Sequence, residues 1–184
     1  MEKGLQWETT WIDLSKGEHK KPEYLAINPV AKVPALIDDG VIVHDSTIIN
    51  EYLEDKFPKA PPLLPKDPAM RSRARSLEDY ADAYLAPSLY KILIQMRKPE
   101  AERDQAKIRE GEEEARKHFA HLDKELAGKQ FLAGMFGLAD ISFIPQLSNY
   151  ERAGYKIGDE FPNLKAWWER LKARESFARS IATE

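Results

Sequence analysis

The sequence predicts a fold in two parts, in which a short α/β segment precedes an all-helical segment. Two short apolar runs flank an Asp-Gly pair at residues 39 and 40, which is typical of a β-hairpin. From Pro68 onward, apolar residues recur every three or four positions, as in amphipathic helices. The stiff, proline-rich stretch PKAPPLLPKDP lies between them. We therefore expect an α/β domain over residues 1–60, a linker over 61–67 and an all-helical domain over 68–184.

The N-terminal stretch LQWETTWIDL, residues 5–14, alternates in the manner of a β-strand. Trp7 and Trp11 fall on one side of such a strand, and we expect both rings to be buried. The polar stretch SKGEHKK then predicts a turn. Residues 22–25 predict a short helical turn that ends at Asn28-Pro29.

The hairpin runs are expected over residues 33–37 and 41–43. Pro34 cannot donate a ladder hydrogen bond, and the X-Pro bond is the one that readily becomes cis, so we expect the backbone groups of Val33 to be available to a ligand. A helix is then expected to open at Asp45-Ser46 and to stop before Pro58. Its apolar positions recur at helical spacing: Ile48, Ile49, Tyr52, Leu53 and Phe57.

The start of this helix offers groups that match the two charged ends of an amino acid. A helix N-terminus presents unpaired N–H groups and a partial positive charge, which suit a carboxylate. The Asp45 carboxylate can pair with a ligand ammonium group. The alternative is that Asp45 and Ser46 only cap the helix, as such residues commonly do.

The pattern NPxxKVPxL, an acidic turn, a short strand, Asp-Ser, an amphipathic helix and a proline-rich linker together resemble the thioredoxin-like half of a cytosolic glutathione S-transferase. The resemblance implies that Val33, before a cis-Pro34, binds the cysteinyl backbone of glutathione as an added strand would. It also implies that Asp45 and Ser46 hold the γ-glutamyl end. Lys32 matches a basic or polar residue near the glycyl carboxylate.

In this resemblance, residues 5–14 match the second strand of the thioredoxin-like domain, and the first strand and most of the first helix are missing. That segment normally carries the catalytic Tyr, Ser or Cys, so no catalytic residue is assigned. The unpaired backbone groups need a replacement partner. The alternatives are a strand from another protomer, re-pairing of residues 5–14 with the hairpin, local disorder of that strand, or a longer parent protein.

The helical half is expected to begin with a long helix from Pro68 to Arg97, kinked at Pro87. Pro99 is expected to open a second long helix that ends near Gly128. A later helix is expected to start at Phe161-Pro162, with Trp167, Trp168 and Leu171 facing inward.

The stretch FGLAD places Gly137 at a helix N-cap and Asp140 three residues later, in the spacing of a capping box. The resembling family usually has Ser or Thr at the cap position, and the motif is structural there. We therefore assign Gly137 and Asp140 to capping and not to catalysis.

Tyr80 and Tyr84 are candidates for the electrophile site, because the first long helix lines that site in the resembling family. The alternative is that they are ordinary core or dimer-contact aromatics. His118 and His121 are three residues apart on a predicted helix, but no third ligand is specified, and no metal is expected.

Composition narrows the function further. The chain has no cysteine, which excludes disulfides, thiolate metal sites and a cysteine nucleophile among its own residues. Its net charge of -3 predicts no nucleic-acid or anionic-membrane partner, and a cytoplasmic location is expected. The resemblance implies a homodimer that binds glutathione as co-substrate and conjugates it to small electrophiles in detoxification. The alternative is a non-catalytic relative that uses the fold for binding or assembly.

Overall fold

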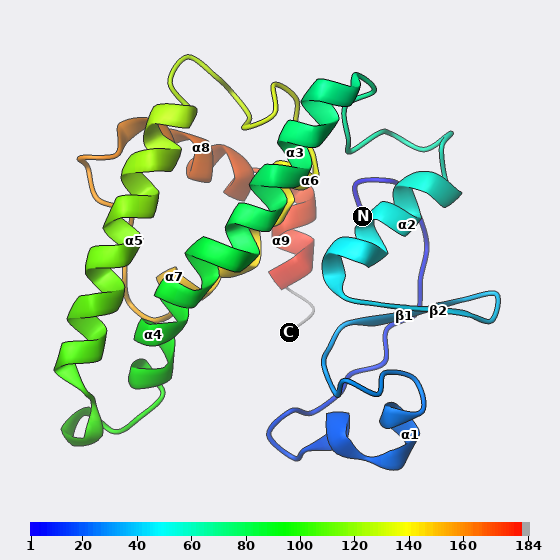
Figure 1. Ribbon diagram of the computed structural model, residues 1–184, viewed down its shortest axis with the longest axis horizontal. Helices are drawn as coiled ribbons and strands as arrows, with labels where there is room; N and C mark the ends of the chain where they lie inside the picture. Colours follow the sequence, from blue (N-terminus) through cyan, green and yellow to red (C-terminus); the bar gives the residue numbers. More distant parts are fainter. Residues whose placement is uncertain (182–184) are drawn as a thin grey trace. The chain divides into compact units, whose positions relative to one another are not determined.

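The computed structural model describes residues 1–181 (Figure 1). The chain divides into two compact units, residues 1–62 and a unit that begins at Leu63. The first unit is α/β and the second is helical. No helix among the described residues is both long and apolar enough to cross a membrane.

The first unit is built around a β-hairpin and one helix, as predicted. The Asp39-Gly40 turn has φ angles of 49° and 83°, the positive values that a tight hairpin turn needs. The strands pair antiparallel, with Leu36 opposite Val43. The elements of this unit are η1 (Glu18–Lys20), α1 (Pro22–Leu25), β1 (Ala35–Asp38), β2 (Val41–His44) and α2 (Ser46–Lys56).

Side chains of α2 fix the turn end of the hairpin. The Tyr52 hydroxyl donates to Asp38 Oδ2 at 2.9 Å, and Lys56 Nζ lies 2.6 Å from the same carboxylate. This ion pair with Lys56, followed by the Tyr52 bond, lowers the pKa of Asp38. A second ion pair, Lys3–Glu54 at 2.6 Å, is buried and ties the start of the described chain to the same helix.

The strand predicted over residues 5–14 is wrong. These residues form no ladder, because the sheet contains β1 and β2 alone in the described part of the chain, so the alternative in which they re-pair with the hairpin is not observed. Trp7 and Trp11 are 51% and 64% exposed, so the prediction of buried rings also fails. Strand-like alternation forms a strand only where a neighbouring backbone is available to pair.

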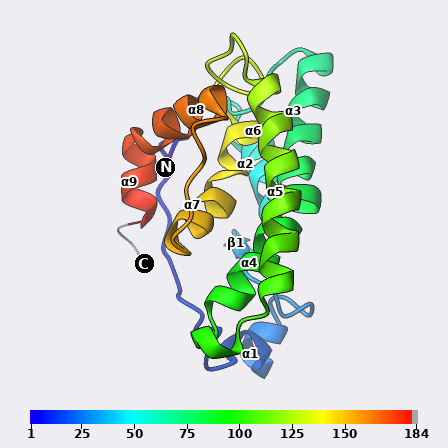
Figure 2. The same cartoon turned by 90° about the vertical axis from the view of Figure 1, so that its left-hand side faces the viewer.

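The second unit is an assembly of helices in which the long α4 and α5 pack against each other (Figure 2). Its elements are α3 (Pro68–Tyr80), η2 (Ala81–Leu85), α4 (Ala86–Met96), η3 (Glu100–Glu102), α5 (Gln105–Glu125), α6 (Leu138–Ile141), α7 (Ile144–Arg152), α8 (Pro162–Lys172) and α9 (Glu175–Ile181).

The two long helices differ from their predicted forms at one point each. In place of a simple kink at Pro87, η2 is a π-helical turn in which the Ala86 N–H donates to the Ala81 carbonyl, five residues back. The second helix begins at Gln105 and not at Pro99. The Asp104 side chain caps it by accepting from the N–H groups of Ala106 and Lys107.

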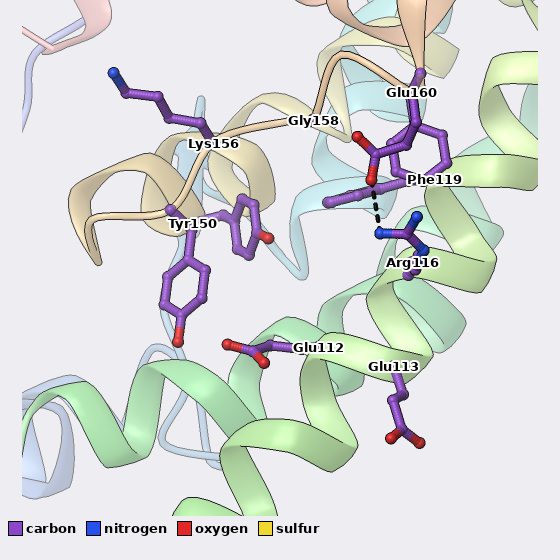
Figure 3. A pocket seen from close by; sticks show the side chains of 10 residues that line it. Glu112, Glu113, Arg116, Phe119, Tyr150, Lys156, Gly158 and Glu160 are labelled. Atoms are coloured by element: carbon purple, nitrogen blue, oxygen red, sulfur yellow. Dashed lines mark hydrogen bonds and ion pairs between the residues drawn. The ribbon is translucent and has the colours of Figure 1, made fainter.

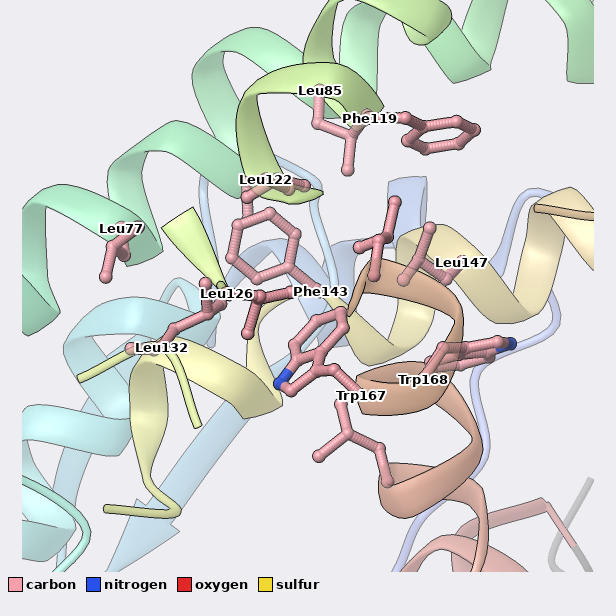
Figure 4. Close-up of a cluster of buried hydrophobic side chains, with 14 of the residues drawn as sticks. Leu77, Leu85, Phe119, Leu122, Leu126, Leu132, Phe143, Leu147, Trp167 and Trp168 are labelled. Atoms are coloured by element: carbon pink, nitrogen blue, oxygen red, sulfur yellow. The ribbon is translucent and has the colours of Figure 1, made fainter. Parts of the chain in front are cut away.

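The core of the second unit lies where α3, α4 and α5 meet the shorter helices (Figure 4). Trp167 and Trp168 are fully buried on α8, as the sequence predicts. Phe143 meets the Trp167 ring edge-to-face, with centroids 5.8 Å apart. The largest fully buried side chains are Trp167, Trp168, Phe143, Leu85, Leu89, Ile92, Leu122, Leu126, Leu138, Leu147, Leu164 and Leu171.

Asp140 has a wider structural role than the capping box implies. It is fully buried and accepts from the Gly137 N–H at 3.1 Å, from the Leu132 N–H at 3.1 Å and from Trp167 Nε1 at 2.8 Å. Burial raises the pKa of this carboxyl group, and the three hydrogen bonds oppose that rise. The capping residue thus also anchors α8 and the preceding loop.

Gly137 is required by a close approach of the chain. A Cβ atom at this position would lie 2.2 Å from the carbonyl oxygen of Leu63, which accepts a hydrogen bond from the Leu138 N–H at 2.9 Å. The departure from Ser or Thr at this cap therefore has a steric reason in this chain.

Replacing Asp140 with Ala should lower the free energy of unfolding by roughly 3–5 kcal/mol, because it strands three buried donors. Chemical denaturation monitored by tryptophan fluorescence measures this loss. Asp104→Ala is the matched control, since it removes a cap at an exposed helix start and should cost clearly less. Equal losses in the two variants would contradict the anchoring part assigned to Asp140.

Gly137→Ala should lower the free energy of unfolding by about 1–3 kcal/mol, because the Leu63 carbonyl must move to admit the methyl group. Gly128→Ala provides a contrast, since its Cβ would meet open space and only the φ of 71° opposes it. Thermal unfolding of both variants measures the difference. A Gly137→Ala protein as stable as the parent would show that Leu63 yields freely.

Candidate functional site

The register of the hairpin brings the two predicted binding segments to one end of the sheet. Ala35, the first residue of β1, pairs with His44, the last residue of β2. Val33-Pro34 therefore enters the sheet beside the point where Asp45-Ser46 leaves it. Residues twelve positions apart in the sequence thus form one local site.

Val33 has the geometry predicted for it. The Val33–Pro34 peptide bond is cis, and Val33 is 41% exposed. Neither its N–H nor its C=O has a hydrogen-bond partner within the described part of the chain. These groups are therefore available to a ligand that lies alongside in an extended conformation.

The loop before Val33 is held by hydrogen bonds from side chains of the first unit. The Lys32 carbonyl accepts from Tyr24 Oη and from Asn28 Nδ2, both at 2.7 Å. Asn28 Oδ1 also accepts from the Val30 N–H at 3.1 Å. Tyr24 and Asn28 are not predicted as part of the site from the sequence, although Asn28 begins the NPxxKVPxL pattern.

Asp45 is the N-cap of α2, which begins where the sequence predicts, at Asp45-Ser46. It has φ 77° and ψ 128°, a combination that L-residues rarely adopt and that costs about 1–3 kcal/mol. Such strain persists where the surrounding structure imposes it, and it is common at ligand-binding positions.

The two oxygens of Asp45 have different environments. Oδ1 accepts from the N–H groups of Thr47 at 3.0 Å and Ile48 at 3.4 Å, so one oxygen performs the capping. Oδ2 has no partner among the described residues. The N–H and hydroxyl of Ser46 are likewise unpaired in that part of the chain, and Ser46 is exposed. Capping and ligand binding are therefore compatible at this helix start.

Lys32 lies on the surface next to Val33. Its carbonyl is fixed by Tyr24 and Asn28, whereas its ammonium group forms no ion pair with any residue in the range 1–181. An exposed cation beside an extended binding segment can meet an anionic end of a ligand.

Tyr80 and Tyr84 lie in the second unit and stack on each other, with ring centroids 5.5 Å apart. Tyr80 Oη is 2.6 Å from His118 Nδ1, and its ring also contacts His121. Burial raises the pKa of Tyr80 and lowers that of His118. Tyr84 is 55% exposed. His118 and His121 are thus packed against Tyr80, and Tyr84 has the more accessible ring.

A separate cavity of about 370 Å³ lies in the second unit (Figure 3). Its walls come from α5, the end of α7 and the following loop, and the Arg116–Glu160 ion pair at 2.6 Å joins α5 to that loop. None of the predicted site residues lines this cavity. The described residues contain no group of three or more His, Cys, Asp or Glu side chains placed to hold a metal ion.

Comparison with known proteins connects this geometry to one family. Residues 1–56 match the family model for the glutathione S-transferase N-terminal domain, and residues 80–175 match that for the C-terminal domain. Glutathione S-transferase hmp2 of Hypomyces subiculosus is 32% identical over 190 aligned positions, which span 99% of this chain and 90% of that protein.

Solved structures agree with the sequence matches. Glutathione transferase F2 from Populus trichocarpa superposes with a TM-score of 0.87 at 28% identity, over 99% of this chain and 88% of that one. Glutathione S-transferase-I, solved with the ligand lactoylglutathione, gives a TM-score of 0.88 at 27% identity over 100% of this chain and 90% of that one. The fold is thus a thioredoxin-like N-terminal part followed by a helical C-terminal part, and the chain belongs to the glutathione S-transferase family.

Proposed function

We propose that this protein binds glutathione at the open end of the β1–β2 hairpin and presents its thiol to small electrophiles. The proposal rests on two neighbouring sets of polar groups that have no hydrogen-bond partner among the described residues. The Val33 backbone can bind an extended peptide, and the Asp45-Ser46 helix start can bind an amino acid's charged ends. Family membership supports glutathione as the compound that joins them.

Each part of glutathione has a chemical counterpart in this site. The γ-glutamyl ammonium group pairs with Asp45 Oδ2, and its carboxylate accepts from the Ser46 N–H and hydroxyl at the N-terminus of α2. The cysteinyl backbone pairs with Val33, held in place beside Pro34. The glycyl carboxylate meets the Lys32 ammonium group. The N-terminal partial charge of α2 also favours negative charge nearby, which includes a glutathione thiolate.

The proposal extends to the organisation of the protein. Residues 1–60 act as the glutathione-binding domain, and residues 68–184 act as the helical domain that supplies electrophile contacts, with Tyr80 and Tyr84 as candidates. The protein acts as a homodimer in the cytoplasm. Light scattering that gives a monomer mass would remove the dimer from this proposal.

Retention on glutathione-agarose, followed by a conjugation assay with 1-chloro-2,4-dinitrobenzene, tests the proposed function. Retention with turnover supports a transferase. Retention without turnover supports the alternative of a family member that uses the fold for binding or assembly. Failure to bind glutathione at millimolar concentration would contradict the proposed function and favour the alternative of a non-catalytic binding or assembly protein.

Asp45→Asn should weaken glutathione binding roughly ten- to a hundredfold, because it removes the charge that faces the ligand ammonium group. It keeps the capping oxygen, so the melting temperature should stay close to that of the parent. Isothermal titration calorimetry and thermal unfolding measure the two effects.

Asp67→Asn is the matched control, because Asp67 caps α3 through the Met70 N–H at 2.9 Å and lies in the other unit. It should leave the affinity unchanged. If Asp45→Asn binds as tightly as the parent protein, Asp45 is only a cap.

Asp45→Gly should separate stability from binding. Glycine adopts positive φ more readily and costs only a few tenths of a kcal/mol as an N-cap, so the variant should unfold at the same or a higher temperature than the parent. The same variant should lose most of its affinity for glutathione. A fall of several degrees in melting temperature would show that the backbone at Asp45 is not strained.

A further inference from the structure

We propose that Tyr24 and Asn28 are positioning residues, which set the direction of the Val33 N–H toward the ligand by holding the Lys32 carbonyl. The inference rests on the proposed function, since it concerns how the Val33 segment is prepared for the cysteinyl backbone of glutathione. Tyr24 and Asn28 would then contribute to binding although neither side chain faces the ligand.

One peptide unit links the Lys32 carbonyl to the Val33 N–H. The Lys32 carbonyl and the Val33 N–H belong to the same planar, trans peptide, in which the two groups point in opposite directions. Two donors that converge on the carbonyl, each at 2.7 Å, therefore fix where the N–H points. Because both donors lie on the carbonyl side, the N–H is directed away from them.

Tyr24 and Asn28 are among the few buried residues of the first unit. Three residues of the range 1–62 are buried as a whole, and two of them are Tyr24, at 7% exposure, and Asn28, at 2%. Both direct a polar group at the same carbonyl oxygen. Two of the three buried residues of this unit therefore hold the peptide that precedes Val33.

The loop from Asn28 to Lys32 is held by Asn28. Asn28 spans the loop, since its side chain meets Val30 and Lys32 and its carbonyl accepts from the Ala31 N–H at 3.0 Å. Ala31 has φ 56°, which alanine rarely adopts. The side-chain contacts of Asn28 hold the loop in a conformation that its own residues do not favour.

Tyr24→Phe tests the inference with the smallest change, because it removes the donor and keeps the ring. It should weaken glutathione binding roughly two- to tenfold in isothermal titration calorimetry, the effect of one hydrogen bond. The backbone ¹³C resonance of the Lys32 carbonyl should also move in the ligand-free protein. Asn28→Asp, which keeps the acceptor for Val30 and loses the donor to Lys32, should move both readouts in the same direction.

Tyr52→Phe is the matched control, since it removes a tyrosine hydrogen bond to Asp38 in the same unit. It should change neither the glutathione affinity nor the Lys32 carbonyl resonance, because the Lys56–Asp38 ion pair still holds the turn end of the hairpin. Equal glutathione affinities of Tyr24→Phe and the parent protein would overturn the positioning role of Tyr24. Global unfolding of Tyr24→Phe would also overturn it, because the hydroxyl would then support the fold as a whole.

The two proposals fail in different ways. If the parent protein binds no glutathione, the proposed function fails, and the Lys32 resonance still reports whether Tyr24 holds the loop. If the parent protein binds and Tyr24→Phe binds equally well, the positioning inference fails alone.

Discussion

The antiparallel register of the β1–β2 hairpin is the constraint on which the proposed site depends. Because Ala35 pairs with His44, the segment that enters β1 and the segment that leaves β2 must lie together. The Asp39-Gly40 turn fixes this register, and Tyr52 and Lys56 of α2 hold the turn from the other side. A slip by one residue would move Val33 away from the helix start and invert the faces of the strands.

The site combines groups that are fixed with groups that are left open. Tyr24 and Asn28 fix the Lys32 carbonyl, and Asp45 Oδ1 fixes the first turn of α2. The Val33 backbone, Asp45 Oδ2 and the donors of Ser46 have no partners among residues 1–181. A ligand that uses these groups finds them already placed, so less of its binding energy is spent on ordering the protein. The strained backbone of Asp45 is consistent with selection for position over stability.

Local chemistry predicts the hairpin, the cap at Asp45-Ser46 and the inward tryptophans of α8, because each depends on residues close together in sequence. The cis state of Pro34 follows from the family resemblance. Local sequence does not decide features that depend on a distant partner or on a choice between two nearby signals. The alternation around Trp7 indicates a strand, yet no neighbouring backbone pairs with it. Pro99 can open a helix, but Asp104 offers a side-chain cap and the long helix begins after it. The hydrogen bond from Trp167 to Asp140 and the convergence of Tyr24 and Asn28 on Lys32 required the tertiary structure.

An NMR titration of ¹⁵N-labelled protein with glutathione locates the binding site residue by residue. We expect the largest amide shifts at Val33, Asp45 and Ser46, on both sides of the open end of the hairpin. Shifts centred on the cavity around Arg116 and Glu160, or the absence of shifts at millimolar glutathione, would contradict this expectation.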